Sequence, residues 1–203
     1  MLRTHRIFTI IIIEKETENM RIITGTARGM KLETLDGDEV TRPTSEKVKE
    51  AVFSAIQFDI EGRRVLDVFG GSGQMALEAL SRGADFAVIG DADKRATEVI
   101  KRNAQKTKLF EKTRILTTDF RSLIKGLAGR ERFDIVFLDP PYEGTMVEES
   151  LSLIMRSDIL SPNAYVICES DKKTPFECEG LGLKRFYKYG RVFVTILVKE
   201  NEI

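Results

Sequence analysis

The chain has 203 residues, which suits one domain with a small appendage, and its 42 % hydrophobic and 32 % charged residues are typical of a globular protein. It holds 32 basic and 32 acidic residues, so bulk charge gives no argument for a nucleic-acid partner. No apolar run approaches the roughly 20 residues of a membrane span. The only histidine is His5, which nearly excludes chemistry that needs a histidine base or histidine metal ligands.

The first 19 residues are expected to form an N-terminal extension, either upstream of a start at Met20 or as an extra strand. The apolar run at residues 7–13 follows basic residues, as in a signal peptide, but it is short and lacks a small-residue cleavage site. Cys168 and Cys178 do not have metal-ligand spacing. A buried, reduced Cys168 fits a cytoplasmic protein.

Residues 20–60 are expected to form an N-terminal β-hairpin and a helix. Short β-prone runs flank Gly25 and Gly29, as in a hairpin. Thr44 or Ser45 can cap a helix, whose apolar residues recur at spacings of three and four: Val48, Val52, Ala55 and Ile56.

Beyond Gly62 strands alternate with helices, which predicts a single α/β domain over residues 61–203. The predicted strands are 65–69, 86–90, 115–117, 133–138 and 164–168, and the predicted helices are 74–81, 94–105, 120–127 and 146–154. The closing runs 186–189 and 192–198 are split by Gly190 and predict an antiparallel hairpin at a sheet edge. The fold class is therefore α/β, with a mostly parallel sheet, helices on both faces and ligands at the carboxyl ends of the strands.

The turn from the first of these strands into its helix is rich in glycine and has the sequence Asp67-Val-Phe-Gly-Gly-Ser-Gly73. Gly71 and Gly73 allow a tight turn and a close approach of a ligand to the backbone. The pattern is not the dinucleotide fingerprint G-x-G-x-x-G. Asp91 ends the next strand about 20 residues later, where an acid can accept hydrogen bonds from ribose hydroxyls. Asp93 is the competing ribose ligand, although it also suits a helix N-cap.

Together these features favour S-adenosylmethionine, which has a ribose and an adenine but no phosphate. Asp67 would hold its cationic methionine end, or alternatively brace the loop. Phe69, in the same turn, is a further candidate contact. Asp119 can accept from the adenine amine while Phe120 packs beside the ring, and a helix N-cap is the alternative role of Asp119.

The catalytic candidates are the tetrapeptide Asp139-Pro140-Pro141-Tyr142, directly after a buried strand. The two prolines stiffen the backbone and remove two amide donors, so the segment presents acceptors, and the tyrosine offers a ring for stacking. Such a pocket suits the exocyclic amine of a base. Acceptors on the amine hydrogens free its lone pair and aim it at a sulfonium methyl group, without a strong general base.

The glycine turn and the tetrapeptide resemble those of class I S-adenosylmethionine-dependent amino-methyltransferases. Over residues 20–198 the chain resembles the RsmD family more closely, in segments 21–32, 41–44, 78–84 and 189–190. The resemblance implies methylation of N2 of a guanine in bacterial 16S ribosomal RNA (rRNA), a seven-stranded sheet and an RNA-holding N-terminal hairpin. It also implies cofactor contacts by Asp67, the glycine turn, Asp91 and Asp119. Gly70 departs from the family, which usually has alanine there.

The zero net charge hides a segregated distribution. Residues 101–132 hold 10 basic and 3 acidic residues, residues 184–199 hold 5 basic and none acidic, and residues 133–180 hold 3 basic and 10 acidic. The cations best placed for phosphates, on loops near the site, are Arg21, Arg28, Lys31 and Arg42. The expected substrate is 16S rRNA, within a small-subunit particle, and the expected enzyme is a monomer.

Two other functions remain open. The tetrapeptide also occurs in DNA adenine-N6 methyltransferases, although the chain has no insert large enough for a target-recognition domain. A protein that binds S-adenosylmethionine or RNA without activity is the other alternative.

Overall fold

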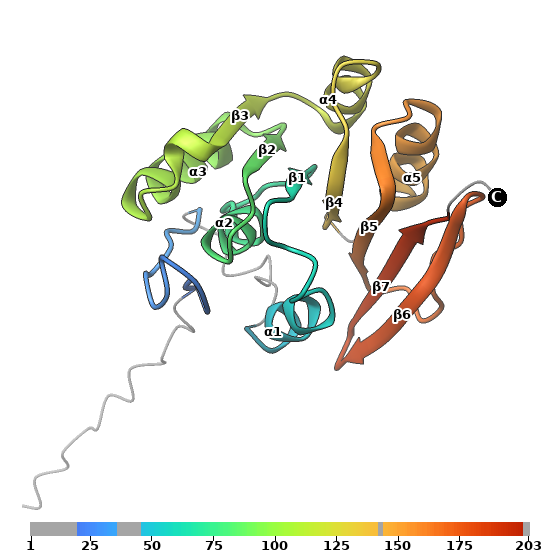
Figure 1. The fold of residues 1–203 in the computed structure, drawn as a ribbon, viewed down its shortest axis with the longest axis horizontal. Helices are drawn as coiled ribbons and strands as arrows, with labels where there is room; N and C mark the ends of the chain where they lie inside the picture. The colour runs from blue at the N-terminus through green and yellow to red at the C-terminus, as the bar shows by residue number, and fades with distance from the viewer. Residues whose placement is uncertain (1–19, 36–45, 142–143, 201–203) are drawn as a thin grey trace, which may run out of the picture.

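A seven-stranded sheet runs through the middle of the protein in the computed structural model, which describes residues 20–35, 46–141 and 144–200 (Figure 1). The strands lie in the order β3-β2-β1-β4-β5-β7-β6. Strands β1 to β5 are parallel, and β7 runs antiparallel to β5 and β6. The bounds are β1 Arg64–Asp67, β2 Phe86–Asp91, β3 Thr113–Thr117, β4 Phe133–Leu138, β5 Leu160–Ser170, β6 Leu181–Tyr189 and β7 Val192–Lys199.

The α-helices cover both faces of the sheet. Helices α1 to α3 share one buried apolar cluster, and α4 and α5 share a second (Figure 1). Consecutive strand residues serve opposite clusters, as Val65 and Leu66 do. The bounds are α1 Glu46–Ala55, α2 Gln74–Ser81, α3 Lys94–Lys106, α4 Phe120–Leu127 and α5 Met146–Arg156, with a 3₁₀ turn at Phe110–Lys112.

The sequence prediction of an α/β fold with an antiparallel C-terminal pair is confirmed. Helices α2 and α4 and strand β4 have the predicted bounds. Strand β5 begins four residues earlier than predicted, because exposed Pro162 and Asn163 break its apolar pattern. Strand β6 also begins earlier; it lies at the sheet edge, where exposed Leu183 and Arg185 interrupt the pattern.

The N-terminal segment, residues 20–33, is a loop closed by one antiparallel bridge between Arg21 and Lys31, which is a reduced form of the expected hairpin. Its Ile22 and Leu32 are buried in the same cluster as α1 and the sheet. The segment lies beside α2 and is coloured blue in Figure 1. Residues 20–60 and the sheet therefore share a hydrophobic core.

Two findings bear on the other expectations. Within the described residues no helix is long and apolar enough to cross a membrane, and no group of three or more potential ligands could hold a metal ion. Cys168 is buried, as expected, and burial raises the pKa of its thiol. The expected extension at residues 1–19 and the expected helix cap at Thr44 or Ser45 lie outside the described residues.

Candidate active site

Three acidic residues lie together at the carboxyl ends of the central strands. Asp67 is the last residue of β1 and is paired with Ile89 of β2 and Phe137 of β4. Asp91 ends β2, and Asp139 directly follows β4. Because these strands are parallel, their carboxyl ends lie side by side, as the sequence predicts.

The glycine turn between β1 and α2 depends on backbone conformations that favour glycine. Gly71 has φ 54° and Gly73 has φ 80°. Among the described residues, nothing lies within 4 Å of the position that a Cβ would take on Gly71, so the turn is open on that side. The Gly70 amide donates to the Gly90 carbonyl at 2.8 Å, and a Cβ on Gly70 would lie 2.6 Å from Cγ2 of Ile89. The turn is therefore packed tightly against β2 at Gly70 and open at Gly71.

Asp91 and Asp93, which the sequence leaves as alternative ribose ligands, have different surroundings. The Asp91 carboxylate accepts from the Gly71 amide at 2.9 Å and from the Asp93 amide at 2.8 Å, so it is tied to the glycine turn. Asp93 is the N-cap of α3, accepts from the Arg95 amide, and forms an ion pair with the Arg95 guanidinium. Hydrogen bonds from Arg95 lower the pKa of Asp93. Asp93 is thus engaged by α3, and Asp91 faces the turn.

Asp67 is the buried acid of the site, with 2 % of its surface exposed. The pKa of its carboxyl is raised to about 7, mainly by burial and next by the charge of Asp139, with a smaller contribution from the charge of Asp91. Hydrogen bonds from the amides of Ala76 and Phe69 oppose the rise. A cation placed beside Asp67 would favour its charged form.

Gln74, the first residue of α2, is a candidate that the sequence analysis missed. It is buried, and its Oε1 has no hydrogen-bond partner among the described residues. An unsatisfied buried acceptor is costly, so a native structure rarely keeps one without a reason. The only sequence signal was a polar residue directly after Gly73, at the start of a mostly apolar helix.

The residues predicted to hold an adenine lie at the start of α4. Asp119 is the N-cap of α4, and its Oδ1 accepts from the amides of Arg121 and Ser122. The ring of buried Phe120 lies 5.4 Å from that of Phe69, and the Arg121 guanidinium lies 4.4 Å from the Phe120 centroid. The structure therefore brings Phe69 and Phe120 together, which the sequence alone did not show.

The predicted catalytic tetrapeptide leaves β4 at the same edge. Asp139 is half-buried, Pro140 is buried and Pro141 is exposed, whereas Tyr142 lies outside the described residues. A cavity of about 60 Å³ adjoins both prolines and reaches Glu169 and Ser170 at the end of β5. A larger depression, about 590 Å³, lies at the amino ends of the strands around Arg64 and has no part in this site.

The four predicted RNA-binding cations differ in their surroundings. Arg21 forms an ion pair with Glu46 of α1 at 2.9 Å, whereas Arg28 and Lys31 are exposed on the N-terminal segment. Arg42 lies outside the described residues. The basic surplus of residues 101–132 is partly neutralised, because five of its cations form ion pairs: Lys101, Arg102, Arg114, Arg121 and Arg132.

Comparison with known proteins gives consistent matches. The family model described as Conserved hypothetical protein 95 matches residues 20–198. YlbH of Bacillus subtilis, described as a candidate rRNA methyltransferase, is 34 % identical over 90 % of this chain and 100 % of its own length. Ribosomal RNA small subunit methyltransferase D of Haemophilus influenzae is 35 % identical over 77 % of this chain and 81 % of its own. The solved structure of Escherichia coli yhhF, described as a candidate methyltransferase, is 30 % identical with a TM-score of 0.81, covering 91 % of this chain and 99 % of that one.

Proposed function

The chain belongs to the Conserved hypothetical protein 95 family, and on this premise we propose that it transfers a methyl group from S-adenosylmethionine to the N2 amine of a guanine in 16S rRNA. The relatives are named as rRNA methyltransferases. The observation that carries the proposal is the meeting of Asp67, Asp91 and Asp139 around an open glycine turn, with two prolines after Asp139.

The residues present fit S-adenosylmethionine. The open side of the turn at Gly71 allows the cofactor to approach the backbone closely. Buried Asp67 is an acceptor for the ammonium group of the methionine part, and the unsatisfied Oε1 of Gln74 is a second. Asp91, tied to the Gly71 amide, is placed for the ribose hydroxyls. Phe69 and Phe120 offer apolar surface to the adenine, and Asp119 offers an acceptor to its amine.

The chemistry of the step divides between cofactor and chain. The bound cofactor supplies an electrophilic methyl group on a positively charged sulfur. Asp139 and the carbonyl of Pro140 accept hydrogen bonds from the guanine amine, which turns its lone pair out of the ring and toward that methyl group. Tyr142 stacks on the base and fixes its plane. Once the methyl group has been transferred, the amine carries one proton too many, and Asp139 or water accepts it.

The substrate is 16S rRNA within a small-subunit particle, and the enzyme acts as a cytoplasmic monomer. Exposed Arg28 and Lys31 contact phosphates beside the site, and Arg42 is a third candidate. Because the net charge is zero, affinity depends on this local group of cations and on the shape of the RNA. Binding to arbitrary naked RNA is therefore weak and sensitive to salt.

The test is transfer from methyl-labelled S-adenosylmethionine to small-subunit particles purified from cells that lack the enzyme. We expect label at one guanine N2, mapped by nuclease digestion and mass spectrometry of the nucleosides. Label on an adenine, or on duplex DNA offered in parallel, would instead support the adenine-N6 function. If the protein binds the cofactor but transfers no label, the proposed methyltransferase activity is refuted and the alternative of a binding protein without activity is supported.

A double variant tests the RNA contacts. Arg28→Glu with Lys31→Glu should raise the KM for particles by at least about 10-fold, because two favourable phosphate contacts become repulsive. Affinity for S-adenosylhomocysteine should not change. The matched control is Lys125→Glu with Arg130→Glu, two exposed cations at and just beyond the C-terminal end of α4, on the other face of the sheet, which should leave the KM within about two-fold.

A further inference from the structure

Asn103 of α3 joins two parts of the protein that are far apart in the chain. It is fully buried, with 0 % of its surface exposed. Its Nδ2 donates to the Ser72 carbonyl in the glycine turn and to the Glu33 carbonyl at the end of the N-terminal segment, both at 2.9 Å. Its Oδ1 accepts from the Glu33 amide at 2.8 Å. The Asn103 side chain thus connects this segment to the turn through three hydrogen bonds.

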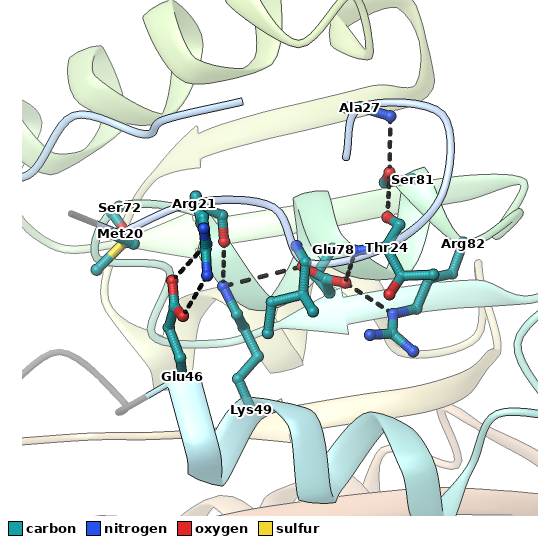
Figure 2. A network of polar contacts seen from close by, with 11 residues as sticks. Met20, Arg21, Thr24, Ala27, Glu46, Lys49, Ser72, Glu78, Ser81 and Arg82 are labelled. Atoms are coloured by element: carbon teal, nitrogen blue, oxygen red, sulfur yellow. Dashed lines mark hydrogen bonds and ion pairs between the residues drawn. The ribbon is translucent and has the colours of Figure 1, made fainter. Parts of the chain in front are cut away.

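The other end of the N-terminal segment reaches the same residue of the turn. The Ser72 hydroxyl donates to Sδ of Met20 at 2.9 Å, as Figure 2 shows. Ser72 is therefore contacted by Met20 directly and by Glu33 through Asn103.

The middle of the N-terminal segment is anchored to α2. Figure 2 shows Glu78 accepting from the amide of Thr24, and Ser81 joined to both Thr24 and Ala27. Its position on the body of the protein is thus fixed independently of Ser72, which makes it a firm support for the turn.

We propose that Asn103 is a positioning residue for the cofactor turn, and that the N-terminal segment is thereby a structural part of the cofactor site. This inference rests on the proposed function for the identity of the ligand. Ser72 lies between Gly71 and Gly73, whose backbones are the least restrained locally. The conformation of the turn therefore depends on bonds from outside it, and Asn103 supplies the bond to its central carbonyl. Without that bond the cofactor must order the turn as it binds, at a cost in affinity.

The sharpest test changes a residue of the N-terminal segment that does not touch the glycine turn. Glu33→Pro deletes the amide that donates to Asn103, and it also removes the Glu33 side chain that pairs with Arg102. The matched control, Glu33→Ala, removes the same ion pair but keeps the amide. We expect the Kd for S-adenosylhomocysteine, measured by calorimetry without RNA, to rise about 5- to 50-fold in Glu33→Pro relative to Glu33→Ala. Equal Kd values would overturn the inference.

A second variant tests Asn103 itself. Asn103→Asp keeps the shape and the acceptor but replaces both donated bonds by repulsion between oxygens, and the Kd should rise at least about 10-fold. The control Arg102→Gln loses the ion pair to Glu33 on the same helix and leaves Ser72 untouched, so its Kd should match that of wild type. With particles as substrate, Asn103→Asp should raise the KM for S-adenosylmethionine while kcat at saturation stays within about three-fold of wild type.

The outcomes separate the two claims. If the wild-type protein does not bind S-adenosylhomocysteine, the proposed function fails. If wild type binds and folded Asn103→Asp and Glu33→Pro bind equally well, only the positioning role fails. A fall in kcat with unchanged Kd would also contradict that role. Should Asn103→Asp not fold, the comparison of Glu33→Pro with Glu33→Ala decides alone.

Discussion

Asp67 and Asp139 lie at the carboxyl ends of the neighbouring parallel strands β1 and β4, and the charge of Asp139 disfavours the charged form of Asp67. Burial is the larger cause, and together they raise the pKa of Asp67 to about 7. The acid that would hold the cationic end of the cofactor is thus half-protonated near neutral pH in the unliganded protein.

Affinity for the cofactor should depend on pH through Asp67. Its carboxylate attracts an ammonium group and its neutral form does not, so affinity for S-adenosylhomocysteine should rise with pH up to about 7 and level off above. Calorimetry between about pH 5 and pH 9 measures the midpoint. Asp139→Asn removes the repelling charge, lowers the pKa of Asp67 and should move the midpoint to lower pH. A profile that is flat across this range would contradict the assignment.

The stability of the unliganded protein should change in the opposite sense. The folded-state pKa of Asp67 lies above its ordinary value of 3.8, so its contribution to stability is complete below about pH 4 and is lost as pH rises to about 7. The difference corresponds to at most about 4 kcal/mol. Asp67→Asn should therefore raise the free energy of unfolding at pH 8, measured with urea, and should abolish cofactor binding. A less stable Asp67→Asn protein would show that the carboxylate braces the loop instead.

Gln74 should stabilise the liganded protein at the expense of the unliganded one. Gln74→Met fills a similar volume and removes the unsatisfied Oε1, so unfolding without cofactor should cost about 1–3 kcal/mol more. The same change should lower affinity for S-adenosylhomocysteine. Thermal unfolding with and without the ligand measures both effects, and an unchanged affinity would remove Gln74 from the cofactor site.

Variants of Asp91 and Asp93 should have different effects: the first on cofactor affinity, the second on stability. Asp91→Ala should weaken cofactor binding at least about 10-fold, because it removes the ribose acceptor and the bond to the Gly71 amide. Asp93→Ala should lower the stability through the lost α3 cap and leave affinity nearly unchanged. Calorimetry on both variants checks this, and the reverse order of affinities would assign the ribose to Asp93.

Asp139 should matter for turnover more than for cofactor affinity. Asp139→Asn keeps the size of the side chain but weakens the acceptor, and we expect kcat to fall about 10²- to 10⁴-fold. At a pH above the Asp67 midpoint the Kd for S-adenosylhomocysteine should stay close to that of wild type. Asp85→Asn, at an exposed position before β2 at the opposite edge of the sheet, is the control. Unchanged turnover in Asp139→Asn would refute the role.

The buried charges under the N-terminal segment should be unequal in importance. Glu78 is fully buried and accepts from the amides of Ile23 and Thr24 and from Arg82, while Lys49 lies 3.9 Å from it (Figure 2). Glu78→Gln replaces one carboxylate oxygen by an amide donor, so one of these buried donors loses its acceptor. The variant should lower the free energy of unfolding by about 3–5 kcal/mol. Lys49→Met should cost less, since Glu78 keeps its other partners and burial already lowers the pKa of Lys49. Urea unfolding of both variants tests the order.

Much of the fold follows from the local pattern. Strands buried on both faces are continuous apolar runs, and the helices between them show a clear spacing of apolar residues, so β4, α2 and α4 could be delimited to the residue. Edge strand β6 could not, because one of its faces is exposed. The acids at the carboxyl ends of the strands follow from the same topology.

Other parts of the site depend on contacts between distant segments. The bonds of Asn103 to Ser72 and Glu33 span 31 and 70 positions of the chain, and no local pattern marks them. The unsatisfied Gln74 and the contact of Phe69 with Phe120 are likewise products of packing. By contrast, the capping roles of Asp93 and Asp119 were available from sequence as alternatives, and the structure shows both.

The seating of the N-terminal segment has a consequence for engineering. A Cβ on Gly25 would lie 1.7 Å from the Ser81 carbonyl oxygen, and Gly25 has φ 90°, so the loop backbone rests directly on the end of α2. Such a loop cannot be exchanged independently of the helix on which it packs. A chimera that takes residues 20–33 from a relative should also take the matching end of α2 and the residue at position 103, so that the packing on Ser81 and the bonds between Glu33 and Asn103 are kept.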